Sequence, residues 1–93
     1  MPKRILAIMK ILPESTDVDF ENLKKEIENV LPKDFELQKG SFKKEYIAFG
    51  LESLNFRLFC PNEDGITDKI EEILGNINGV QRAETVMMSL TDL

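Results

Sequence analysis

The 93-residue sequence contains no histidine and no tryptophan, and Cys60 is its one cysteine. Histidine is the side chain best suited to proton transfer near neutral pH, so its absence excludes Ser-His and Cys-His nucleophile pairs. A single cysteine cannot form an internal disulfide, which fits a reducing compartment, and we expect a cytoplasmic protein. Cys60 falls on the apolar face of a predicted strand, where a packed thiol is a better interpretation than a reactive one.

Motifs for metal ions, phosphate groups and catalytic carboxylates are missing as well. The acidic residues within 17–28 match the spacing of a calcium loop, but that loop needs a glycine where this chain has Asn22. No glycine-rich loop leads into the Lys and Ser/Thr pair that holds a phosphate. Glu71 and Glu72 are neighbours, and adjacent helix positions do not face the same point. We therefore expect no cofactor, no bound metal and no catalytic side chains.

The charge balance argues against nucleic acid and membrane partners. The net charge is −5 and the isoelectric point about 4.7, which is the wrong sign for binding a phosphate backbone. Residues 44–49 loosely resemble the aromatic sheet motif of RNA-recognition domains, but Glu45 stands where that motif has glycine. Lys10 interrupts the apolar N-terminal stretch and Pro13 follows it, so neither a signal peptide nor a membrane span is expected.

Hydrophobic periodicity predicts six elements in the order strand, helix, strand, strand, helix, strand. Alternating apolar residues predict strands over 4–12, 51–60 and 80–90, with a weaker strand signal over 35–42. Apolar residues spaced three and four apart predict helices over 18–31 and 66–76. Ser15, Thr16 and Asp17 offer oxygens for the turn and the N-cap before the first helix.

This order of elements predicts an α+β fold, the ferredoxin-like βαββαβ sandwich, in a single domain over residues 1–93. Two crossovers and a hairpin form a four-stranded antiparallel sheet with both helices on one face. The first strand would bury Ile5, Ala7, Met9 and Ile11 and turn Leu6, Ile8, Lys10 and Leu12 to the other face. The sheet face without helices would be a platform for a partner.

Several short motifs follow one another in an order and spacing that are specific although each motif is weak alone. The clearest is Ile47-Ala48-Phe49-Gly50-Leu51. The others are Pro13-Glu14-Ser15, Asp17-Val18-Asp19, Lys24-Lys25-Glu26-Ile27, Asn55, Gly65 and Gly79-Val80. Over essentially its whole length the chain resembles the archaeal elongation factor 1-beta family, the guanine-nucleotide exchange factors of the GTPase elongation factor 1-alpha. The fold of that family is the ferredoxin-like one.

The resemblance implies a protein that promotes exchange of GDP for GTP on elongation factor 1-alpha by binding near the magnesium and phosphate site. Binding of this kind opposes nucleotide binding and breaks no bond, so the chain is not expected to be an enzyme. The implied contact residues include Ile47, Ala48, Phe49 and Gly50. In eukaryotic relatives the aromatic residue before the glycine inserts into the GTPase, and Phe49 matches it. The alternative interpretation is that Phe49 caps the core.

Thr91, Asp92 and Leu93 are the second set of contact residues that the resemblance implies. Eukaryotic relatives carry a penultimate lysine that enters the magnesium site and displaces the ion. In this chain the penultimate residue is Asp92, which can attract a magnesium ion but cannot replace its charge. The chain therefore departs from the family at the residue on which the lysine mechanism depends.

Two other functions remain open from the sequence. One is a ferredoxin-like protein- or ligand-binding module with an unrelated partner, which the apolar Leu6 and Ile8 on the open sheet face motivate. The other is a small hydrolase on the same fold, which an assay of acylphosphate hydrolysis tests. We expect the free chain to be a monomer, and a dimer that buries the open sheet face would favour the first alternative.

Overall fold

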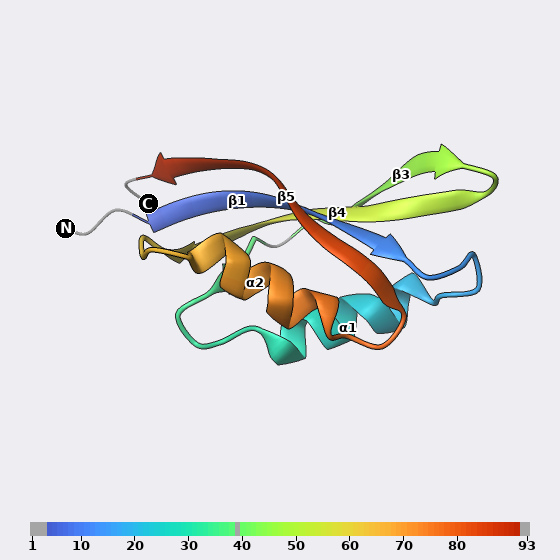
Figure 1. The fold of residues 1–93 in the computed structure, drawn as a ribbon, viewed down its shortest axis with the longest axis horizontal. Helices are drawn as coiled ribbons and strands as arrows, with labels where there is room; N and C mark the ends of the chain where they lie inside the picture. Colours follow the sequence, from blue (N-terminus) through green and yellow to red (C-terminus); the bar gives the residue numbers. More distant parts are fainter. Residues whose placement is uncertain (1–3, 39, 92–93) are drawn as a thin grey trace.

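The computed structural model describes residues 4–38 and 40–91 (Figure 1). Its elements are β1 (Arg4–Pro13), α1 (Phe20–Val30), β2 (Glu36–Leu37), β3 (Lys43–Ala48), β4 (Leu51–Pro61), α2 (Ile66–Gly75) and β5 (Val80–Thr91). The strands form an open antiparallel sheet, and both helices lie on the same face of it (Figure 1). The predicted ferredoxin-like α+β fold is confirmed.

The described sheet has five strands, where the sequence predicted four. The predicted strand over 35–42 is wrong in its bounds, because β2 and β3 are separate strands that pair with successive parts of β4. Ser41 lies between them, where its Oγ accepts a hydrogen bond from the Arg57 amide at 3.1 Å and donates one to the Gln38 carbonyl at 2.7 Å. These side-chain bonds satisfy backbone groups that a continuous strand would have paired.

The core lies between the helices and the sheet. Every second residue of β1 is buried, as predicted, with Ile5, Ala7, Met9 and Ile11 facing the helices. Most of the other buried apolar side chains come from the predicted apolar faces of β4 and the two helices. They are Leu54, Phe56, Leu58 and Cys60 of β4, Leu23 and Ile27 of α1, and Ile66, Ile70 and Leu74 of α2.

Helix α1 is shorter than predicted at both ends. Its N-cap is Asp19, whose carboxylate accepts a hydrogen bond from the Glu21 amide at 3.0 Å, so the helix begins at Phe20 and not at residue 18. Ser15 instead stabilises the preceding turn, where its Oγ accepts a bond from the Asp17 amide at 3.2 Å. The helix ends at Val30 because Leu31, which precedes a proline, is extended.

Neither helix is long enough to cross a bilayer. Helix α1 has 11 residues and α2 has 10, whereas a membrane span needs about 20 apolar residues. No longer helix occurs in the part of the chain that the structure describes.

Burial predicts effects of very different size for alanine substitutions at two phenylalanines of this chain. Phe56 is 1% exposed, so Phe56→Ala is expected to lower the free energy of unfolding by about 3–5 kcal/mol. Phe49 is 94% exposed, so Phe49→Ala is expected to change it by less than about 0.5 kcal/mol. Urea unfolding followed by circular dichroism measures both. Equal losses for the two variants would contradict the described core.

Candidate partner-binding site

A two-residue turn, Phe49-Gly50, joins β3 to β4. Ala48 and Leu51 are the last paired residues on either side, and Phe49 and Gly50 have φ angles of 53° and 80°. Two successive positive φ angles are what a type I′ hairpin turn requires, because its twist matches that of the flanking strands. Glycine adopts this backbone without strain, but a residue with a Cβ atom does not.

Phe49 occupies the strained position of this turn and gains no burial in return. It is the one non-glycine residue with a positive φ among the described residues, and 94% of it is exposed. The left-handed backbone costs a residue with a Cβ atom about 1–2 kcal/mol, and an asparagine would be the ordinary choice. The alternative in which Phe49 caps the core is therefore excluded. A strained backbone that carries an exposed aromatic side chain is a reason to look for function there.

The exposed apolar surface at this end of the molecule extends beyond Phe49. We define the hairpin tip as residues 46–50, in which Tyr46 is 68% and Ile47 is 40% exposed. The strand register shifts between Tyr46 and Ala48, which leaves Ile47 as the extra residue of a bulge. Sequence reasoning missed Tyr46, although its place immediately before the family motif was a usable signal.

Hydrogen bonds hold the base of the hairpin against the sheet. Ser53 is fully buried, and its Oγ donates to Oδ1 of Asn55 at 3.1 Å. The side-chain amide of Asn55 donates to Glu45 at 3.2 Å, and Lys10 of β1 forms an ion pair with the same carboxylate at 3.9 Å. This chain of contacts joins β1, β3 and β4, so the direction of the hairpin is set by the sheet.

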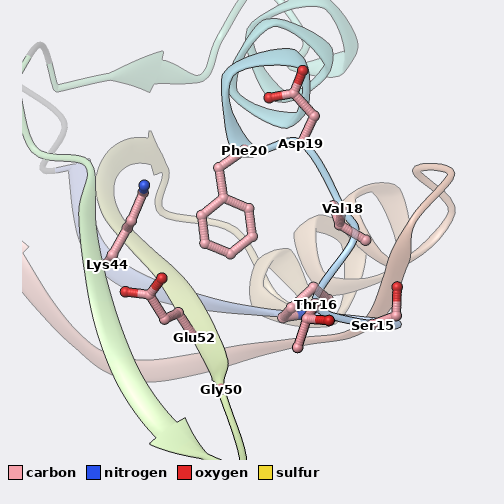
Figure 2. Close-up of a pocket in the computed structure, with 9 residues that line it drawn as sticks. Ser15, Thr16, Val18, Asp19, Phe20, Lys44, Gly50 and Glu52 are labelled. Carbon is pink, nitrogen blue, oxygen red and sulfur yellow. The ribbon is translucent and has the colours of Figure 1, made fainter.

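A cleft of about 250 Å³ separates the hairpin from the segment that connects β1 to α1 (Figure 2). Thr16 and Asp19 line it from one side, and Lys44 and Glu52 line it from the hairpin (Figure 2). The ammonium of Lys44 lies 5.7 Å from the centre of the Phe20 ring, which ties the hairpin to the first turn of α1. The structure thus brings together two motifs far apart in the sequence, 13–19 and 47–51.

The cleft offers side chains of both charges and no group of ligands for a metal. Among residues 4–38 and 40–91, no three His, Cys, Asp or Glu side chains gather in a way that could hold an ion. The carboxylate of Asp19 already caps α1. The cleft and its neighbouring hairpin tip together offer a surface with charged and apolar side chains.

Cys60 is a core thiol, as the sequence predicted. Its side chain is fully buried, with Sγ 3.7 Å from the carbonyl oxygen of Ile5. Burial raises the pKa of the Cys60 thiol above its ordinary value, and the negative charge of Asp34 adds to the rise. A buried thiol with a raised pKa supplies no nucleophilic thiolate at neutral pH.

Comparison with known proteins decides the family. The EF-1 guanine nucleotide exchange domain family matches this chain over residues 6–90, which includes the hairpin, the cleft and both helices. The chain belongs to the EF-1 guanine nucleotide exchange domain family. Membership makes it a guanine-nucleotide exchange domain of the translation elongation machinery, as the sequence motifs indicated.

Archaeal relatives match the exchange domain along most of their own length. Elongation factor 1-beta of Methanothermobacter thermautotrophicus is 44% identical over 80 residues, which cover 86% of this chain and 88% of that protein. Elongation factor 1-beta of Staphylothermus marinus is 39% identical over 82 residues, with 87% and 89% covered. Elongation factor 1-beta of Saccharolobus islandicus is 39% identical over 83 residues, with 88% and 89% covered.

The exchange domain does not place its two predicted contact regions together. Thr91 ends β5 and pairs with Arg4, which in turn pairs with Pro61 at the end of β4. The hairpin tip lies at the beginning of β4, ten residues earlier, or about 33 Å along the strand. Figure 1 shows the hairpin and the end of β5 at opposite ends of the long axis. Asp92 and Leu93 lie outside the described residues.

Relief of the strain at Phe49 is expected to stabilise the exchange domain. Phe49→Asn places a residue that tolerates the left-handed backbone in the turn, so the free energy of unfolding should rise by about 1 kcal/mol. Phe49→Ala keeps a Cβ atom and with it the penalty, and so serves as the control. Chemical denaturation compares the two variants. A Phe49→Asn variant that is no more stable than Phe49→Ala would show that the turn is unstrained.

The raised pKa of Cys60 predicts a loss of stability in alkaline solution. Because the pKa is higher in the folded state, unfolding releases a proton once the pH exceeds the ordinary thiol pKa of about 9. The contribution of Cys60 is fully present below that pH and is lost as the pH rises through the folded pKa. The unfolding free energy measured between pH 7 and 10 should fall more steeply for the original chain than for Cys60→Ala. Parallel pH profiles would show that the thiol titrates alike in both states.

Proposed function

We propose that this chain promotes the release of GDP from elongation factor 1-alpha by binding the GTPase near its magnesium and phosphate site, with Phe49 as the inserted contact. Membership of the exchange-domain family and the names of the archaeal relatives support this proposal. The observation that carries it is the exposed Phe49, held by a strained turn at the end of an anchored hairpin. The chain then acts by binding and makes or breaks no bond.

Binding alone is sufficient for exchange when it is coupled to the nucleotide. Suppose that an exchange protein binds the nucleotide-free GTPase more tightly than it binds the GDP complex. The exchange protein then weakens the binding of GDP, and GDP weakens the binding of the exchange protein by the same ratio. Burial of a phenylalanine side chain contributes about 1.5–3 kcal/mol, which is enough to shift such an equilibrium by at least tenfold. The two-residue turn and the Ser53–Asn55–Glu45 contacts hold Phe49 in place beforehand, so little ordering entropy opposes its insertion.

The carboxyl end is proposed as the second contact of the same partner. Thr91, Asp92 and Leu93 would approach the GTPase from the other end of the sheet, with Asp92 where eukaryotic relatives have a lysine. An aspartate cannot take over the charge of a magnesium ion, so in this proposal the coupling to the nucleotide depends mainly on Phe49 and its hairpin.

The release of a fluorescent GDP from the archaeal GTPase, chased with excess unlabelled nucleotide, tests the proposal. The original chain should accelerate release strongly, and Phe49→Ala should lose at least about tenfold of that acceleration. Phe49→Leu keeps a large apolar side chain and should retain most of it. Lys25→Ala, an exposed change on α1, is the control that should act like the original chain.

Two results would contradict the proposal in different ways. A folded original chain that leaves the release rate unchanged would mean that this scaffold serves another partner. Full activity of Phe49→Ala with an intact fold would leave the exchange function standing and remove Phe49 from the contact.

A further inference from the structure

Strand β5 forms an edge of the described sheet and carries four exposed apolar side chains within five residues. We call them the β5 strip: Val86, Met87, Met88 and Leu90, which are between 51% and 60% exposed. Met87 pairs with Ile8 and lies on the open sheet face, whereas Met88 pairs with Ala7 on the helix side. The strip therefore exposes apolar surface on both sides of one edge.

Apart from a bulge at Val86, this edge lacks the features that ordinarily protect an exposed strand. Natural edge strands are short, or they carry lysines, prolines or inward charges that prevent pairing with other chains. Strand β5 has 12 residues, and no charged residue or proline occurs from Thr85 to Thr91. An exposed apolar edge of this length indicates a surface that is covered in the working protein.

A basic group of side chains adjoins the strip on the open sheet face. Ile8 pairs with Met87 on one side and with Arg57 on the other, so a continuous row crosses β5, β1 and β4. Ile8, Lys43 and Arg57 line a shallow cleft of about 160 Å³. No carboxylate of the described residues forms an ion pair with Lys43 or Arg57. In a chain with a net charge of −5, these two free cations favour an acidic partner surface.

The hairpin tip is too small to form a stable interface alone, which also points to a contact on the open sheet face. A stable interface buries about 800 Å² per partner and uses some 20–30 residues, far more than the tip of one hairpin supplies. The hairpin and the end of β5 lie at opposite ends of a molecule 44 Å long (Figure 1). A partner that reaches both ends without covering the helices can lie along the open sheet face, which β5 borders on one side (Figure 1).

We propose that the β5 strip, together with Ile8, Lys43 and Arg57, is a second docking surface for the GTPase and binds an apolar, acidic part of it. This inference rests on the proposed function and extends it from the hairpin tip to the open sheet face. The apolar strip supplies most of the buried area, and the two cations orient the partner and speed its approach.

Titration of the nucleotide-free GTPase with three charge variants tests the docking surface. Met87→Glu and Arg57→Glu should each raise the dissociation constant at least about tenfold. Lys69→Glu changes the net charge as Arg57→Glu does but lies exposed on α2, and it should stay within about twofold of the original chain. Arg57→Glu should also make binding less sensitive to salt. Urea unfolding should show that all three variants keep the stability of the original chain.

The possible outcomes separate this inference from the proposed function. If the original chain binds the GTPase and Met87→Glu and Arg57→Glu bind equally well, the docking surface is overturned and the exchange function stands. If the original chain does not bind the GTPase at all, both are overturned. Sedimentation of the free chain tests for a dimer. If the free chain is a dimer and Met87→Glu makes it a monomer, the strip binds a second copy of the chain and the inference is overturned.

Discussion

The pairing of β1 with β4 is the interaction on which the rest of the molecule depends. Buried residues face each other across it in successive pairs, from Ile5 with Cys60 through Met9 with Phe56 to Ile11 with Leu54. Side chains alternate between the faces of a strand, so a slip of one residue would turn this whole apolar set toward solvent. The same register leaves Ile8 and Arg57 on the open face, where both line the shallow cleft that also includes Lys43.

The position of the hairpin tip follows from the unequal reach of these two strands. The pairing with β1 begins only at Leu54, so the first residues of β4 continue past it and pair with β3 alone. Beyond Leu54 there is little core to bury Tyr46 or Phe49, and both remain exposed. The fold thus places an aromatic side chain far from the hydrophobic core while the contacts at Ser53, Asn55 and Glu45 keep its support rigid.

The sequence predicted the parts of the fold in which burial alone decides the structure. The alternation in β1 and the spacing in α2 each allow one buried face, and both predictions are confirmed. The strand predicted over 35–42 was wrong in its bounds because Ser41 replaces ladder bonds with its own hydroxyl, and residue type does not reveal that. The start of α1 was displaced because Ser15, Thr16, Asp17 and Asp19 are all capable caps. Phe49 was ambiguous since a phenylalanine is ordinarily buried, and only its backbone angle and exposure resolve the choice.

Strain at Phe49 and exposure of the β5 strip are the same kind of departure from what folding alone would select. An asparagine at 49 and charges along β5 would both make the free chain more stable or more soluble. The two features occur in one small domain, and the open sheet face connects them. The core of the domain shows no comparable departure among the described residues. In the proposed complex the partner covers the strip and buries the aromatic ring, and this burial offsets both costs. A factor that works only through binding energy needs such surfaces, because its effect comes entirely from the contacts that it makes.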